Sequence, residues 1–318
     1  MRAAMKRRQR NRRILLLSIA AVAIVVVIVS AFVLGSIINP TSSSLINKPV
    51  TSQIYSSLES LSKSTYSYTD PTLMSGGATN QANAGVQNNA KNSGGVTYTE
   101  NGKPIIVYIG GEYCPYCGFQ RWPLILSLMR FGNLTGLEFM QSSATDVFPN
   151  TYTFTFLTAK YTSPYFYFQS FEQVDRNEEP LQTVPSNYTG VFADYGSGYP
   201  YINFANKYVI SGPFYVPSLF TGLNWTQIIQ QIGSNTELSD QVQAATNTIT
   251  AVICSVDGSQ PASVCGNSAI TPLISTVSYH SEPSASLKTG SPIEMASTWA
   301  SVQYGQMAWI KKSSAIMR

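Results

Sequence analysis

Apolar positions form one long uncharged stretch near the start of the chain and shorter periodic segments after it. Residues 14–34 are 21 consecutive positions without a charge. At about 1.5 Å per residue, such a helix is roughly 30 Å long, which matches the hydrocarbon core of a bilayer. A cleaved signal peptide is the alternative, but its apolar core is shorter, about 7–15 residues. Because Ile37 and Ile38 extend the apolar character, the pattern favours an uncleaved transmembrane anchor.

The segment after the anchor predicts a stalk, a short helix and a flexible linker over residues 35–95. Ile54, Leu58 and Leu61 recur at helical spacing and predict an amphipathic helix over residues 50–63. Residues 76–95 are rich in Gly, Asn, Ala and Gln. This composition offers too little apolar surface to bury, so it predicts a loop.

From residue 96 the pattern is typical of a mixed α/β domain. An apolar run at residues 104–109 predicts a buried strand, and residues 119–131 have helical periodicity. With a second short strand at residues 137–141, this predicts a βαβ unit. Further on, the pattern predicts one or two strands, a hairpin and two helices, over residues 152–171, 201–210, 223–232 and 238–252. We assign residues 96–282 to this domain, and residues 283–318 to a tail of uncertain structure.

The distribution of charged residues predicts how the chain is oriented across a membrane. Seven of its 20 basic residues lie in the first 13 positions, and the remaining 13 face all 16 acidic residues, so the rest carries −3. Basic clusters next to an apolar span stay on the cytoplasmic side. This predicts a cytoplasmic segment at residues 1–13, contact with membrane lipid through residues 14–34, and an extracytoplasmic domain. The folded part lacks the basic face of a nucleic-acid reader, so no nucleic-acid partner is expected.

Four cysteines carry the candidate chemistry. Cys114 and Cys117 form a Cys-x-x-Cys motif, while Cys254 and Cys265 lie further apart near the end of the domain. Pro115 suits the first position of a helix, which places Cys114 at the helix N-terminus, where amides and the macrodipole favour a thiolate. We therefore expect Cys114 to be the exposed attacking thiol with a lowered pKa, and Cys117 the more buried resolving thiol. The redox-active disulfide would need no cofactor.

Other interpretations of the cysteines remain open at this stage. Cys114 and Cys117 could form a static disulfide or bind a soft ion such as Cu(I). A zinc site needs four ligands and would have to use all four cysteines, because His280 is the only histidine. For Cys254 and Cys265 a structural disulfide is favoured, with a relay to a membrane redox partner as the alternative.

The motif Gly-Gly-Glu-Tyr-Cys-Pro-Tyr-Cys at residues 110–117, followed by Arg121-Trp122, resembles thioredoxin-like proteins, including glutaredoxins with the same Cys-Pro-Tyr-Cys. Longer stretches resemble the mostly archaeal domain-of-unknown-function 929 family: YIGGEYCPYCGFQRW, VFPNTYTFTF, YTSPYFYFQSFE and ITAVICSVDGSQPASVC. The resemblance covers residues 104–265. It implies a thioredoxin-like fold, but the family carries no assigned function.

The thioredoxin resemblance also implies a cis-proline that opens a strand beside the cysteine pair. Pro200 fits this position, with Tyr199 offering its backbone to an extended substrate peptide. An ordinary strand-initiating proline is the alternative. Tyr116 and Pro115 would complete the substrate groove. About sixty residues separate Gln141 from Pro200, which implies an insertion at about residues 142–198.

Weaker signals surround this motif. Glu112 is either a proton acceptor for the thiols or a solvated acid, and Arg121 is either a modulator facing the site or a surface residue. Three Asn-x-Thr sequons are candidate glycosylation sites, at Asn133, Asn187 and Asn224. No metal site is predicted.

Together these patterns predict a membrane-anchored, extracytoplasmic thiol–disulfide oxidoreductase of oxidase or isomerase type. Its partners would be the thiols and disulfides of exported proteins, because disulfides persist outside the cytosol. The alternative is a non-catalytic cell-surface binding or structural protein with two structural disulfides.

Overall fold

A computed structural model describes residues 44–64, 66–70, 85–89, 96–212 and 217–280. The segments predicted to be cytoplasmic, membrane-spanning and tail, residues 1–13, 14–34 and 283–318, lie outside this part. The chain divides into two units between Lys48 and Pro49, and the elements below belong to the second. No helix within the described ranges is both long and apolar enough to cross a bilayer.

The second unit is built on a mixed sheet with β3 (Lys103–Gly110) at its centre. Parallel β8 (Tyr167–Glu172) pairs with one edge of β3, and antiparallel β9 (Tyr201–Phe204) with the other. The remaining strands extend the sheet: β10 (Tyr208–Ser211), β1 (Val86–Asn88) and β2 (Thr99–Glu100). Because β3 is buried on both faces from Ile105 onward, its sequence is a continuous apolar run.

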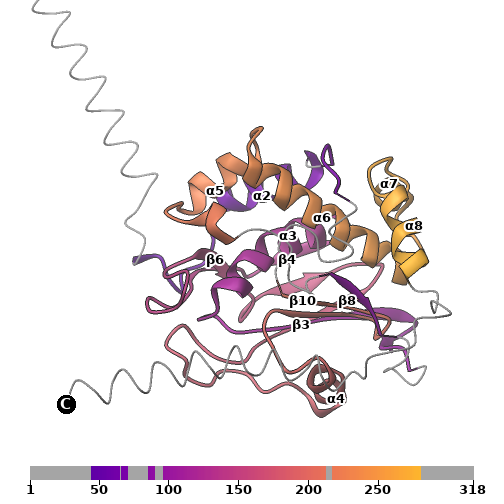
Figure 1. The fold of residues 1–318 in the computed structure, drawn as a ribbon, viewed down its shortest axis with the longest axis horizontal. Helices are drawn as coiled ribbons and strands as arrows, with labels where there is room; N and C mark the ends of the chain where they lie inside the picture. The colour runs from indigo at the N-terminus through magenta and orange to yellow at the C-terminus, as the bar shows by residue number, and fades with distance from the viewer. Residues whose placement is uncertain (1–43, 65, 71–84, 90–95, 213–216, 281–318) are drawn as a thin grey trace, which may run out of the picture. The chain divides into compact units, whose positions relative to one another are not determined.

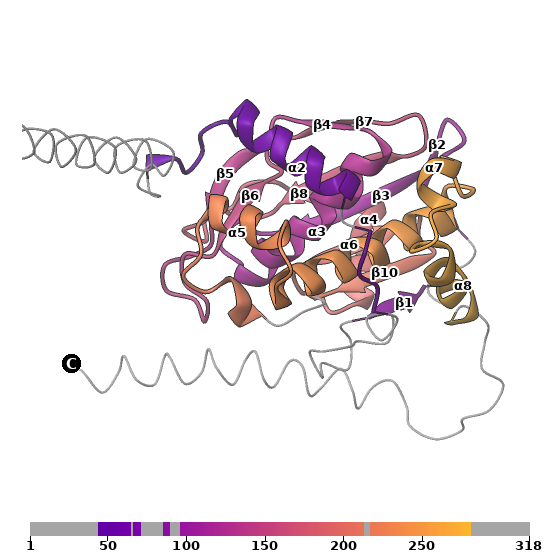
Figure 2. The same ribbon diagram turned by 90° about the horizontal axis from the view of Figure 1, so that it is seen from above.

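Helices cover both faces of this sheet, as Figures 1 and 2 show. One face carries four helices: α2 (Ser52–Ser64), α3 (Pro115–Phe131), α5 (Trp225–Ile232) and α6 (Glu237–Val256). The opposite face carries α4 (Ser186–Asp194). The chain past α6 forms the shorter helices α7 (Ala262–Cys265) and α8 (Thr271–His280). This arrangement confirms the mixed α/β class.

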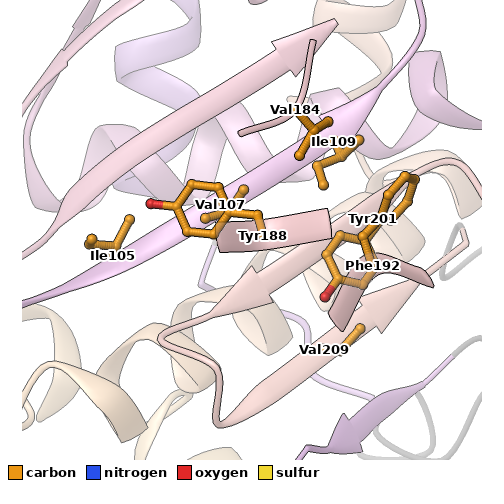
Figure 3. Close-up of a cluster of buried hydrophobic side chains, with 8 residues drawn as sticks. All are labelled: Ile105, Val107, Ile109, Val184, Tyr188, Phe192, Tyr201 and Val209. Atoms are coloured by element: carbon orange, nitrogen blue, oxygen red, sulfur yellow. The ribbon is translucent and has the colours of Figure 1, made fainter. Parts of the chain in front are cut away.

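Alternation along β3 divides its side chains between the two helical layers. Ile105, Val107 and Ile109 join a cluster with Tyr188 and Phe192 of α4 (Figure 3). Tyr108 points the other way, because its ring lies 5.7 Å from the guanidinium carbon of an arginine on α3. The side chain of Tyr108 therefore lies between β3 and α3, the helix that bears the cysteines.

The partner of β3 differs from the sequence prediction. Residues 137–141 were expected to be the second strand of a βαβ unit, but β5 (Glu138–Gln141) pairs antiparallel with β6 (Tyr152–Thr155) in a separate sheet. The parallel partner is β8, which lies inside the range assigned to an insertion. A third small pairing joins β4 (Asn133–Thr135) to β7 (Lys160–Thr162). Local alternation marks a strand but does not identify its partner, and this is why the pairing was wrong.

The linker also contributes a strand that the composition did not predict. Residues 86–88 form β1 at the edge of the sheet. Asn89 is fully buried, and its amide donates to the side-chain oxygen of Asn206 at 2.6 Å. Main-chain pairing and this amide contact hold the segment, so the prediction of an unpacked loop is wrong for these residues.

Several local predictions are confirmed. The amphipathic helix, the 201–210 hairpin and both later helices appear as α2, β9–β10, α5 and α6. Asn224 caps α5 in a capping box with Gln227, so one of the three sequon asparagines is engaged in a helix cap. The other two, Asn133 and Asn187, are exposed, and their glycosylation stays a prediction.

The predicted disulfide between Cys254 and Cys265 is confirmed. Both residues are buried, and their Cα atoms lie 5.6 Å apart. The bond joins the end of α6 to α7. Because these two sulfurs are bonded to each other, a zinc site built from all four cysteines is not formed.

Removing this disulfide should lower the free energy of unfolding by about 3 kcal/mol, the loop-closure entropy of a bridge spanning 11 residues. The comparison is best made in a Cys114→Ala/Cys117→Ala chain, with and without Cys254→Ala/Cys265→Ala, by urea unfolding in detergent. In that background Cys114 and Cys117 are absent, so no second disulfide can form and affect the measured stability. Equal urea midpoints for the two chains would contradict a stabilising role.

Candidate functional site

Cys114 and Cys117 lie where β3 passes into α3. β3 ends at Gly110, and Cys114 is the N-cap of α3 with Pro115 at the first helical position. The backbone amide of Cys117 donates to the sulfur of Cys114 at 3.3 Å. A Cys side chain here does what Ser or Asp does at an ordinary N-cap, accepting from an otherwise unpaired amide. The predicted position of the pair at a helix N-terminus is confirmed.

The exposure of Cys114 differs from the prediction. Cys114 is only 6% exposed and Cys117 is fully buried, and the two are not bridged. Burial raises the pKa of the Cys114 thiol, against the expectation from the helix N-terminus alone. For Cys117 burial also opposes ionisation, but the hydrogen bond from Cys114 and the charge of Arg121 lower its pKa. The charge of Arg121 therefore favours ionisation of the inner sulfur.

Tyr199, the residue before Pro200, contacts the loop that carries the cysteine pair. The Tyr199–Pro200 peptide bond is cis, and Pro200 is buried immediately before β9. The Tyr199 ring packs edge-on against Tyr113, the residue before Cys114, with centroids 6.4 Å apart. Its hydroxyl donates to Gln173 at 2.7 Å. The structure therefore brings together two segments that are more than eighty residues apart in the sequence.

Aromatic rings also flank the pair on the side of Tyr116. The half-buried Tyr116 meets Phe148 at 6.0 Å between centroids, and Phe148 meets Phe119 at 5.6 Å. Phe148 comes from the loop between β5 and β6. The cysteine motif and its contacts thus include four partly exposed aromatic residues: Tyr113, Tyr116, Phe148 and Tyr199.

Arg121 is a buried member of the site and not a surface residue. It is fully buried on α3, and its Nε and Nη2 donate to the two carboxylate oxygens of Glu172 at 3.1 and 2.6 Å. Nη2 also donates to the carbonyl of Gly111 at 3.0 Å, in the loop that carries the cysteines. Burial alone would lower the pKa of Arg121, but the carboxylate of Glu172 overrides it and raises that pKa. Arg121 therefore remains a cation beneath the cysteine loop.

Glu112 is also buried, against its interpretation as a solvated acid. It is 3% exposed, and Thr155 donates to its carboxyl at 2.6 Å. Burial raises the pKa of Glu112 to about 7, and the nearby Glu172 adds to this shift. The chain therefore carries a buried carboxyl with a pKa near neutrality two residues before Cys114 in the sequence.

The raised pKa of Glu112 predicts a pH dependence of stability. Its folded pKa of about 7 exceeds the ordinary 4.5, so the folded chain binds more protons in this window and loses stability as pH rises from about 4.5 to 7. Glu112→Gln should flatten that decline, as measured by urea unfolding at successive pH values.

Asp257 provides the matched control for this experiment. Burial raises its pKa from 3.8 to about 7 as well, and it caps the far end of α6. Glu112→Gln should therefore remove only part of the decline, and Glu112→Gln/Asp257→Asn should remove more. A pH profile unchanged by Glu112→Gln would show that this carboxyl is not held neutral.

Three further residues of the site escaped the sequence analysis: Tyr108, Thr155 and Glu172. Each lies in a strand and contacts Glu112 or Arg121. The sequence offers two local signals. One is Glu172, a carboxylate that ends an aromatic-rich strand, and the other is Arg121, an arginine among mostly apolar neighbours on its helix. No periodic pattern joins the two, because they lie 51 residues apart.

Comparison with protein families gives one match. The family model described as a domain of unknown function (DUF929) matches residues 89–255, more than half of the 318 residues. The match contains both cysteines of the motif, Pro200 and Cys254, and ends before Cys265. Neither the curated proteins nor the solved structures contain a match. The chain therefore belongs to the DUF929 family.

Proposed function

We propose that this chain is a membrane-anchored, extracytoplasmic thiol–disulfide oxidoreductase with a thioredoxin-like domain. One observation carries the proposal: two unbridged thiols sit at the N-terminus of α3, with the amide of Cys117 on the sulfur of Cys114 and the Tyr199–Pro200 segment alongside. Thiols at a helix N-terminus are arranged for disulfide exchange. The anchor and the location rest on the sequence alone.

The order of strands supports the thioredoxin-like part of the proposal. β8, β3, β9 and β10 lie in that order, with β8 parallel and β9 antiparallel to β3. The cysteine helix α3 follows the central strand, and α6 packs against α3. A strand, a Cys-x-x-Cys helix, a parallel strand and then an antiparallel hairpin opened by a proline are the parts expected of such a domain.

The proposed reaction exchanges one disulfide for another. A substrate thiolate attacks the sulfur of Cys114 in the oxidised protein, the Cys114–Cys117 bond breaks, and Cys117 leaves as a thiolate. A second substrate thiolate then attacks the substrate sulfur of the mixed disulfide and releases Cys114. The substrate gains a disulfide and loses two electrons, which the protein holds as its two reduced sulfurs.

The proposal predicts reversible exchange with glutathione. The full-length chain in mild detergent should equilibrate between disulfide and dithiol at residues 114–117 as the ratio of reduced to oxidised glutathione is varied. Alkylation followed by mass spectrometry of the peptide containing both cysteines measures the fraction oxidised. Cys254 and Cys265 should stay bonded over the same range, because both are buried.

The burial of both thiols favours a second candidate, the non-catalytic surface protein. A buried thiol with a raised pKa reacts slowly. In that case residues 114–117 would show no exchange with glutathione while the chain remains folded. Exchange within minutes would exclude this candidate, and its absence would return the cysteine pair to a structural role.

A further inference from the structure

Two hydrogen-bond donors are buried without an acceptor in the layer between β3 and α3. Within the described ranges, Nη1 of Arg121 and the hydroxyl of Tyr108 have no hydrogen-bond partner, and both residues are fully buried. Leaving a buried donor unpaired costs about 1–3 kcal/mol. Such a cost at two neighbouring groups calls for an explanation.

The two donors belong to one cluster. The guanidinium carbon of Arg121 lies 5.7 Å from the centre of the Tyr108 ring. The Tyr108 hydroxyl packs against Gly110, where even a Cβ would overlap with it. Gly110 and Gly111 begin the cysteine loop, and Arg121 holds the carbonyl of Gly111. These two unpaired donors therefore lie where β3 meets the cysteine loop.

The sulfur of Cys117 lies within the electrostatic reach of this cluster. Cys117 is fully buried one helical turn before Arg121. The charge of Arg121 and a contact with the backbone of Gly111 both favour its ionised form, whereas Glu172 opposes it. Between fully buried groups, a cation acts on an anion far more strongly than it does at the surface.

We propose that Arg121, together with the hydroxyl of Tyr108, is a positioning residue that holds the negative charge left on Cys117 when the Cys114–Cys117 bond breaks, and thereby makes the pair an oxidant of substrate thiols. This inference rests on the proposed function and specifies the direction of the reaction, which is the oxidation of substrate thiols.

The step balances without an external oxidant. A substrate thiolate forms a bond to the sulfur of Cys114, and the electron pair of the Cys114–Cys117 bond departs on Cys117. The protein disulfide is the oxidant and is reduced in the process. A group that stabilises the thiolate product stabilises the reduced protein, which raises the potential of the pair.

The test measures the equilibrium with glutathione in the full-length chain in detergent. Arg121→Met/Glu172→Leu removes both charges, so neither is left buried alone. We expect its equilibrium to shift about tenfold toward the protein disulfide, which corresponds to about 30 mV. The thiolate absorbance of the reduced chain should appear at higher pH in the same variant.

Tyr108→Phe provides a conservative second variant. It keeps the ring and removes only the hydroxyl, so it should fold, and it should shift the equilibrium about threefold in the same direction. Two controls change similar groups away from the cysteines. Tyr161→Phe removes a partly buried hydroxyl that donates to the carbonyl of Leu128, and Arg130→Lys changes a second buried cation of α3. Neither should move the equilibrium.

The outcomes separate the inference from the function on which it rests. Wild-type exchange with unshifted equilibria in both test variants would overturn the role of Arg121 and Tyr108 and leave the proposed function standing. A shift toward the dithiol would overturn it as well. No exchange in the wild type would remove the proposed function itself. If Arg121→Met/Glu172→Leu does not fold, Tyr108→Phe decides.

Discussion

A Cys117→Ser chain should accumulate as a mixed disulfide with its substrate, and its turnover should fall by at least about a hundredfold. After Cys114 has attacked a substrate disulfide, Cys117 is the thiol positioned to release it. Well-oriented intramolecular attack can match effective concentrations of about 10⁵ M or more, far above any external thiol. Without Cys117 the adduct persists.

The adduct is measured by incubating the reduced chain with a disulfide-containing unfolded protein and analysing the products by non-reducing gel and intact mass. Cys114→Ser provides the matched control, because the remaining Cys117 is fully buried whereas Cys114 is 6% exposed. It should form little adduct. Equal capture by the two variants would overturn the assignment of Cys114 as the attacking residue.

Glu172→Leu should destabilise the chain by about 3–5 kcal/mol, because it leaves the cation of Arg121 buried without its carboxylate. Both side chains are fully buried, and their closest N–O distance is 2.6 Å. Breaking one side of such a pair costs more than removing both. Arg121→Met/Glu172→Leu should therefore lie within about 2 kcal/mol of the wild type, although the amide of Phe156 also loses an acceptor.

Urea unfolding of the wild type, both single variants and the double variant completes a double-mutant cycle for this pair. The expected pattern is a large loss for Glu172→Leu, a smaller one for Arg121→Met, and recovery in the double variant. Losses that simply add would mean that the two charges do not depend on each other in the folded chain.

The local features of the site could be predicted from the sequence because they depend on neighbouring residues. Cys114, Pro115 and Cys117 define the start of α3 through spacing alone. The apolar run of β3 and the hairpin around Asn206 follow from composition and turn chemistry. The family match at residues 89–255 also follows from the sequence alone.

Burial of the charged groups was decided by the tertiary structure. Nothing near Glu112 in the sequence shows that Thr155 will cover it, and nothing near Arg121 identifies Glu172 as its partner. The expectation of an exposed Cys114 failed for the same reason, since exposure depends on what packs over the helix N-terminus.

The sequence by itself determined where the cysteine pair stands on its helix and the positions of β3, α3, the β9–β10 hairpin, α5 and α6. Only the tertiary structure decided that β8 lies parallel to β3, and this pairing carries Glu172 to the end of β3 opposite Gly110. The physical reason is that spacing and periodicity describe contacts within one helix or strand. The charge environment of a buried sulfur is the sum of contacts between segments far apart in the chain.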